Sequence, residues 1–153
     1  MSSTPKVILR TAKKEDCPQL LLLIQELATF EREPNAVTVT LSEMEDAGFG
    51  SNPVWNAFVI EVDGQIVGMS LYYVRYSTWK GRRLYLEDLI ITEQFRGKGF
   101  GKMLLDKTIA YAKENGYFGI VWQVLDWNTP AIDFYKKYDA HFDTDWWNVS
   151  VNW

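Results

Sequence analysis

A short run of glycines and basic residues, Arg96-Gly97-Lys98-Gly99-Phe100-Gly101, has the clearest potential for chemistry in this chain. It follows the apolar run 84–91 and precedes a segment with helical spacing, so we expect a strand, a turn and a helix start. Glycines let backbone N–H groups approach an anion closely, and the first helical turn leaves unpaired donors with a partial positive charge. Arg96 and Lys98 add two full charges. The pattern predicts a phosphate-binding loop, with a glycine turn that binds nothing as the plain alternative.

The spacing of the glycines excludes two familiar nucleotide motifs. A P-loop requires Gly-Lys followed by Ser or Thr, but here Gly97-Lys98 is followed by Gly99. A dinucleotide-binding fingerprint requires G-x-G-x-x-G, and Lys102 occupies the position of its third glycine. What remains is the pattern R-x-x-G-x-G.

The elements around this loop alternate between strand and helix. Asp16 with Gln19, and Ser42 with Glu45, have the spacing of helix-start signatures. We expect helices over about 16–30, over 42–48 with Gly48 as its end, from the glycine loop to 115, and over 128–138. Strands are expected at 7–9, 55–62, 66–76, 83–91 and 120–125, with a last strand in the aromatic tail 141–153. Asp63-Gly64 suits a tight hairpin turn between two of them.

Composition limits the classes of function. The 153 residues suit a single domain, 1–153, and the net charge of −4 argues against a general nucleic-acid binder. Cys17 is the only cysteine, and no apolar run is long enough for a signal peptide or a membrane span. We therefore expect a cytoplasmic protein without disulfides. The lone His141 has no partner at metal-ligand spacing, so no metal is expected.

Beyond the glycine loop, several motifs carry a resemblance to a known family. They are Tyr85-Leu86-Glu87-Asp88, Trp127-Asn128-Thr129-Pro130, Phe134-Tyr135-Lys136-Lys137, Glu26-Leu27-Ala28 and Gly48-Phe49-Gly50. With the order of elements, they resemble the GCN5-related N-acetyltransferases, and within them the spermidine/spermine (diamine) branch. The resemblance runs from about Val7 to Tyr138. It implies an α/β (α+β) fold with a mixed, mostly antiparallel sheet flanked by helices, whose fourth and fifth strands splay apart.

The resemblance also implies how acetyl-CoA would be held. The pyrophosphate would lie on the loop from Arg96 to Lys102, with Gly97, Lys98, Gly99, Phe100 and Gly101 between them. Backbone N–H groups of Leu89, Ile90 and Ile91 would bind the pantetheine arm and the acetyl carbonyl. Asn128, with Pro130 beside it, resembles the residue that reaches the cofactor arm, and Asn128 is equally suited to cap a helix.

Two residues are expected to carry the chemistry of acetyl transfer to an amine. Tyr135 is the candidate general acid, because a phenol with a reference pKa of about 10 is protonated at neutral pH and also matches the family's tyrosine. Glu87 is the candidate carboxylate near the amine, as a base or as a partner for an ammonium. Glu87 and Asp88 occupy consecutive strand positions, so we expect their side chains on opposite faces.

The expected acceptor is a small cationic amine, such as a polyamine, a diamine or a lysine-like amino acid. Phe30 and Glu31 resemble the aromatic and acidic pair that lines the acceptor channel in this branch, and Glu87 and Asp88 are also expected to bind the acceptor. The resemblance also favours a homodimer, which would suit the tryptophans at 146, 147 and 153. The alternatives are a non-catalytic acyl-CoA-binding regulatory module and an acetyltransferase that acts on protein lysines or N-termini.

Overall fold

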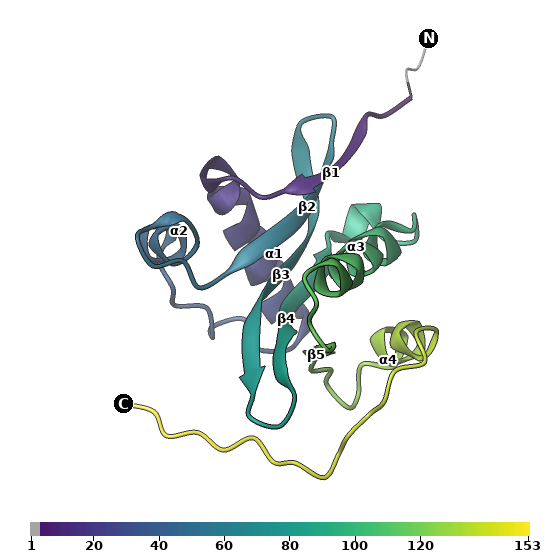
Figure 1. Cartoon of the computed structure of the whole chain (residues 1–153). Helices are drawn as coiled ribbons and strands as arrows, with labels where there is room; N and C mark the ends of the chain where they lie inside the picture. The colour runs from purple at the N-terminus through teal and green to yellow at the C-terminus, as the bar shows by residue number, and fades with distance from the viewer. Residues whose placement is uncertain (1–3) are drawn as a thin grey trace. The chain divides into compact units, whose positions relative to one another are not determined.

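The computed structural model describes residues 4–153, and its centre is one five-stranded sheet (Figure 1). The strands follow each other across the sheet in chain order, and only the last pair, β4 and β5, is parallel. Their bounds are β1 Val7–Thr11, β2 Asn56–Val62, β3 Gln65–Ser77, β4 Gly81–Ile91 and β5 Ile120–Trp122. The predicted hairpin is confirmed, and its turn is at Asp63 and Gly64, both with positive φ. The mixed, mostly antiparallel sheet of the prediction is therefore present.

Four α-helices accompany the sheet: α1 Cys17–Phe30, α2 Leu41–Phe49, α3 Phe100–Glu114 and α4 Thr129–Lys136. Contacts divide the chain after Gln123 into two compact units, so that α4 and the tail belong to the second one. The first unit contains the whole sheet, α1, α2 and α3. No helix among the described residues has the length and apolar character needed to cross a membrane.

Two predicted helix starts differ in their capping bonds. Asp16 is the N-cap residue of α1, as predicted, but its carboxylate forms no bond to the first turn and instead accepts hydrogen bonds from Arg10 and from the Lys13 N–H. The cap of α2 is Thr40, which accepts from the Glu43 N–H while Glu43 accepts from the Thr40 N–H. This capping box lies two residues before the predicted one.

The C-terminal end of α2 also differs from the prediction. The helix continues past Gly48 to Phe49, and Gly50 is the residue that caps it. Gly48 is buried inside the helix, where a Cβ would collide with the Trp55 ring. The glycine there serves a close packing contact and not a helix stop.

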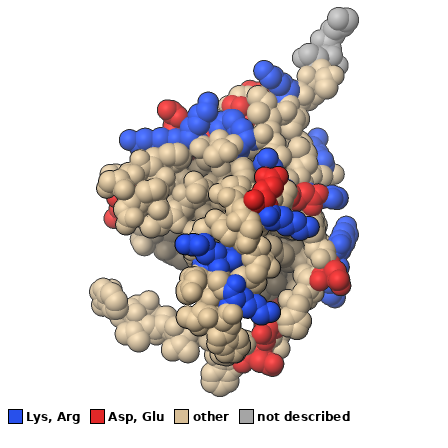
Figure 2. All heavy atoms as spheres, in the orientation of Figure 1, with Lys and Arg blue, Asp and Glu red and all other residues tan. Residues whose placement is uncertain are grey.

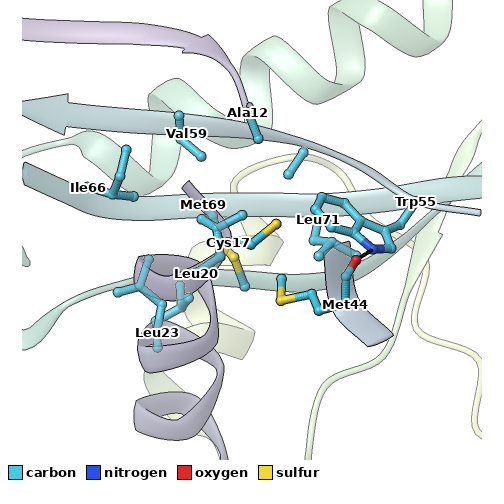
Figure 3. Packing of buried hydrophobic residues seen from close by; sticks show 12 residues of the cluster. Ala12, Cys17, Leu20, Leu23, Met44, Trp55, Val59, Ile66, Met69 and Leu71 are labelled. Atoms are coloured by element: carbon cyan, nitrogen blue, oxygen red, sulfur yellow. Dashed lines mark hydrogen bonds between the residues drawn. The ribbon is translucent and has the colours of Figure 1, made fainter. Parts of the chain in front are cut away.

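The core has one layer on each face of the sheet. Against one face, α1 and α2 bury Leu20, Leu23 and Met44 on Val59, Met69 and other strand residues, and the Trp55 indole donates to the Met44 carbonyl (Figure 3). Against the other face, α3 buries Leu104 and Ala112 on a second cluster that includes Phe58 and Tyr72. We call these the α1 face and the α3 face of the sheet.

Strand β4 is irregular at the point where the predicted site begins. Its pairing with β3 shifts between Leu86 and Asp88, which leaves Glu87 as the extra residue of a β-bulge. Its parallel pairing with β5 also ends at Leu86, opposite Trp122. From Glu87 to Ile91, β4 therefore has β3 as its one strand neighbour in the described part of the chain. This is the predicted splay of the fourth and fifth strands.

The predicted last strand, in the tail 141–153, is wrong. No strand is present there, and every residue of the segment is exposed. Its side chains alternate as in a strand, with Trp147 and Val149 nearly nine-tenths exposed. A strand also needs a neighbour for its backbone groups, and residues 4–153 provide none for this segment.

Candidate active site

The glycine loop lies directly between β4 and α3, as predicted. A short 3-10 turn, Glu93–Phe95, leads into it, and Gly97 and Gly99 have φ values of 77° and 83°. Gly99 is the N-cap of α3 and supplies no side chain to the first-turn N–H groups. A Cβ at Gly97 or Gly99 would meet no atom within 4 Å, so the loop borders open space. The first turn of α3 is thus available to an anion.

The Arg96 side chain was expected to bind a phosphate, but it forms its contacts with α1 and with the end of β4. Its guanidinium donates to Glu26 of α1 at 3.1 Å and to the Ile91 carbonyl at 2.8 Å, and lies over the Phe30 ring. Glu26 also accepts from the Thr92 hydroxyl at 2.6 Å. Arg96 and Glu26 therefore fasten the start of the loop to α1. Lys98 is exposed, and the structure shows no ion pair for it within residues 4–153.

The backbone of β4 next to the loop offers outward-facing groups at alternate residues. The Thr92 N–H donates to the Val67 carbonyl of β3. Antiparallel pairing alternates, so Ile90 also turns its backbone groups toward β3, whereas Leu89 and Ile91 turn theirs away. The Ile91 carbonyl accepts a hydrogen bond from Arg96. Of the three predicted N–H groups, those of Leu89 and Ile91 therefore point away from β3, on the side where β4 has separated from β5. The N–H of Ile90 points toward β3.

The bulge brings the two carboxylates of β4 to the same face of the sheet. Asp88 pairs with Leu71, which is part of the core on the α1 face. Glu87 accepts a hydrogen bond at 3.0 Å from the hydroxyl of Tyr73, which shares that face because it is two residues from Leu71. The expectation of opposite faces is therefore wrong, because the extra residue of a bulge interrupts the alternation.

Asp88 is the carboxylate with the most altered acidity. Burial, followed by the charges of Glu87 and Glu31, raises the pKa of Asp88 to about 6. Glu31 caps the C-terminal end of α1, and burial raises its pKa also. The structure thus brings together the three carboxylates that were predicted to contact the acceptor, Glu31, Glu87 and Asp88, closely enough for their charges to interact. Two carboxylates of this cluster carry pKa values shifted toward neutrality, as is common for groups that exchange protons.

The remaining predicted residues belong to the second unit. Asn128 is the N-cap of α4 and accepts from the Ala131 N–H at 3.4 Å, which confirms its expected capping role. Pro130 lies in the first turn of that helix. Tyr135 is 8% exposed, whereas the neighbouring Phe134 is only partly buried. Tyr135, and not Phe134, is therefore the buried aromatic residue of this pair.

Two residues of the site were missed by sequence reasoning. Glu26 was noted only as part of a motif, and its role depends on Thr92 and Arg96, which are 66 and 70 positions away. Tyr73 lies in an aromatic strand where no local signal separates it from its neighbours. Its alternation with Leu71 and its pairing with Tyr85 would have put it on the correct face.

No group of three or more His, Cys, Asp or Glu side chains in residues 4–153 is arranged to hold a metal ion. His141 is exposed in the tail.

Comparisons with known proteins agree with this geometry. The pattern of the acetyltransferase (GNAT) family matches residues 18–139, which span both units. The thialysine N-epsilon-acetyltransferase of Bos taurus is 38% identical over 88% of this chain and 84% of that protein. The human spermidine/spermine N(1)-acetyltransferase-like protein 1 is 34% identical over 86% of this chain and 20% of that protein.

The fold has close structural counterparts. A crystal structure of an aminoglycoside acetyltransferase from an uncultured soil metagenomic sample has a TM-score of 0.79 and covers 95% of this chain and 97% of that one. It is 20% identical in sequence, so it bears on the fold alone. The bulged and splayed β4, the glycine loop at the start of α3 and the match over 18–139 lead to one conclusion: the chain belongs to the acetyltransferase (GNAT) family.

Proposed function

We propose that this enzyme transfers the acetyl group of acetyl-CoA to a primary amine of a small cationic acceptor, by direct attack in a ternary complex. The observation that carries the proposal is the divergence of β4 from β5 at Glu87. The last five residues of β4, directly before the loop, carry both the outward N–H groups and the two carboxylates Glu87 and Asp88.

The cofactor would bind along the α3 end of β4. The N–H groups of Leu89 and Ile91 would hold the pantetheine arm and the acetyl carbonyl, and the first turn of α3 with Lys98 would hold the pyrophosphate. Donors fixed before the reaction stabilise the developing oxyanion without reorganising, which is the largest effect in many acyl transfers. Arg96 acts as a positioning residue through Glu26.

The acceptor would approach from the α1 face. An alkyl ammonium has a pKa of about 10.4, so roughly one molecule in a thousand is neutral at pH 7.4 and a base is needed. Asp88 is suited to take this proton because its pKa is raised to about 6. Glu87, held by Tyr73, and Glu31 would bind a second positive charge of the acceptor.

Tyr135 would donate the proton to the departing CoA thiolate. The support for this role is its Phe-Tyr context on α4, which matches the tyrosine of the family, and the protonated state of a phenol at neutral pH. Asn128 would contact the cofactor arm through groups that its capping bond leaves available.

The names of the relatives support the cationic acceptor. Thialysine and spermidine/spermine, in the names of the bovine and human proteins, are both amines with more than one nitrogen. The mixture of positive and negative side chains on the face drawn in Figure 2 has no large basic area of the kind that nucleic acids require.

The test is a set of amines assayed by release of free CoA thiol. Diamines and lysine-like amines should have kcat/KM values about 10- to 100-fold above neutral-tailed monoamines of equal length, because a charge-assisted hydrogen bond to a carboxylate is worth that factor. Glu87→Gln should narrow this ratio. Equal kcat/KM values for butylamine and putrescine would contradict the proposal that the acceptor carries a second positive charge. Acetyl-CoA binding without turnover of any amine or peptide would favour a regulatory module.

We also propose that the protein acts as a homodimer. The support is the exposed tail 141–153, which carries alternating apolar side chains and backbone groups without a strand neighbour in the described chain. Light scattering should give twice the mass of the chain, and truncation after Ala140 should give the monomer. A monomeric full-length chain would contradict this.

A further inference from the structure

A pair of buried hydroxyl groups joins α3 to the sheet. Ser70 of β3 and Thr108 of α3 are both fully buried, and their side-chain oxygens lie 2.8 Å apart. The Thr108 hydroxyl donates its single proton to the Leu104 carbonyl at 2.7 Å, so the Ser70 hydroxyl must donate to Thr108. The helix and the central strand are therefore connected by a hydrogen bond that water does not reach.

This bond differs in kind from the other contacts of α3 with the sheet. The buried residues of the helix are Leu104, Leu105, Thr108 and Ala112, and Thr108 is the polar one among these four. Apolar contacts have no preferred direction and allow a helix to slide or rotate slightly, whereas a hydrogen bond weakens steeply when its geometry changes. The bond from Ser70 to Thr108 therefore fixes the position of α3 along β3.

The attachment lies directly opposite the two residues of β4 that have outward N–H groups. Ser70 pairs with Leu89 in the strand register, and Gly68 pairs with Ile91. A Cβ at Gly68 would collide with the Ile91 side chain and would lie 3.3 Å from the Leu104 side chain, so α3 approaches the sheet closely at this point. The helix is thus attached to β3 at the same two positions where β4 carries the proposed donors.

The proposed cofactor site has two halves, which belong to different elements. The N–H groups of Leu89 and Ile91 would hold the pantetheine arm, and the first turn of α3, after Gly99, would hold the pyrophosphate. A ligand that contacts both halves gains affinity from its own linkage only if the halves keep the separation that it requires. The helix is continuous from Gly99 to Thr108, about 14 Å, so a shift at Thr108 also moves the first turn.

We propose that Ser70 and Thr108 are positioning residues for acetyl-CoA, because their bond holds the first turn of α3 at the required distance from the N–H groups of β4. This inference rests on the proposed function and adds to it the residues that align the two halves of the cofactor site. Both hydroxyl groups are enclosed by protein, so they act through the position of α3 and do not touch the cofactor.

The test compares the binding of CoA with that of its two parts, pantetheine and 3′-phospho-ADP, by calorimetric titration. The product of the two fragment Kd values, divided by the Kd of CoA, is an effective concentration that measures how well the site aligns its halves. Ser70→Ala removes the bond to α3 and leaves no buried donor unpaired, because Thr108 still donates to Leu104. We expect this variant to lower the effective concentration by about tenfold and to keep both fragment Kd values within about twofold.

Further variants separate the position of α3 from a general loss of stability. The double variant Ser70→Ala with Thr108→Val replaces both hydroxyl groups by apolar groups and should behave like Ser70→Ala. Thr108→Ser retains the hydroxyl and should keep the effective concentration of the wild type. Trp55→Phe is the control, because it removes another buried hydrogen bond, to the Met44 carbonyl on the α1 face, and should change stability alone.

The outcomes distinguish this inference from the proposed function. An effective concentration that is unchanged in the folded Ser70→Ala protein and in the double variant would overturn the inference and leave amine acetylation intact. An equal decrease in Trp55→Phe would overturn it too, because the effect would then follow stability. So would a wild type that binds CoA no more tightly than the better of the two fragments. A decrease confined to the Ser70 variants, in an enzyme that acetylates no amine, would defeat the proposed function alone.

Discussion

The Tyr73 hydroxyl donates a hydrogen bond of 3.0 Å to Glu87, the residue that the bulge of β4 adds to the strand. Burial, and then the bond to Glu87, raises the pKa of Tyr73 to about 12. The phenol thus remains a donor across the physiological pH range, and the carboxylate of Glu87 is held on the α1 face beside Asp88.

Loss of this donor should impair the acceptor site and leave the cofactor site unchanged. Tyr73→Phe removes one hydrogen bond to an exposed carboxylate, so we expect kcat/KM for the best amine to fall by about 3- to 10-fold. The KM for acetyl-CoA should be unchanged. Tyr76→Phe is the control, because Tyr76 is 70% exposed on the same strand and faces the opposite side. An unaffected kcat/KM in Tyr73→Phe would show that the orientation of Glu87 is unimportant.

The glycine loop should tolerate no side chain at the cap of α3. Gly99→Asp forces a β-carbon into a backbone conformation with φ of 83° and puts a negative charge beside the pyrophosphate. We expect CoA affinity, measured by calorimetry, to fall by about 100-fold or more. Gly64→Asp makes the equivalent change at a φ of 86° in the β2–β3 turn and should bind CoA normally. Normal CoA affinity in a folded Gly99→Asp protein would show that the loop does not bind the cofactor.

Tyr135→Phe tests the general acid. The change keeps the ring that is buried on α4 and removes only the hydroxyl, so the fold and the CoA affinity should persist. We expect kcat to fall by about 10²–10⁴-fold, the usual range for a general acid. Tyr138→Phe removes a hydroxyl from the same part of the chain and should have little effect on kcat. A near-normal kcat in Tyr135→Phe would assign this tyrosine to packing.

Asp88 should make the stability of the protein depend on pH. Its pKa is about 6 in the folded chain against 3.8 for the unperturbed group. Between these values the folded state binds more protons than the unfolded state, so stability should decrease as the pH rises from about 4 to 6. Because the two pKa values differ by about 2, this ionisation changes the free energy of unfolding by up to about 3 kcal/mol. Asp88→Asn should remove this dependence.

Denaturant unfolding at several pH values checks this prediction. Asp88→Asn should match the wild type near pH 4 and be more stable near pH 7, while kcat/KM at pH 7 should fall because the base is lost. Asp133→Asn removes one exposed charge on α4 and serves as the control. Wild-type stability that rises from pH 4 to 6, with no difference in Asp88→Asn, would show that Asp88 ionises normally.

The sequence by itself determined the sheet and the position of the loop. The apolar runs of β2 and β3, with the turn residues Asp63-Gly64 between them, are a local property that survives in the folded chain. The same holds for Gly97 and Gly99, whose positive φ few other residues could adopt. Asn128 as a cap is equally local, since its acceptor oxygen and the Ala131 N–H are three residues apart.

Errors arose where a local pattern needed a partner elsewhere. The tail 141–153 alternates like a strand, but alternation does not supply the second strand that backbone groups require. Asp16 has the spacing of a helix cap, yet Arg10 on β1 offers it a charge-assisted bond and two donors, which a single backbone N–H cannot match.

The arrangement of the charged groups was decided by the tertiary structure. Glu87 and Asp88 share a face only because the register between β3 and β4 shifts at that point, and a register shift depends on how two strands pair. The Arg96 side chain binds Glu26 and does not extend over the rest of the glycine loop, because folding brings α1 to the end of β4. Sequence periodicity describes each element alone, whereas the partners of a charge are fixed by which elements pack together.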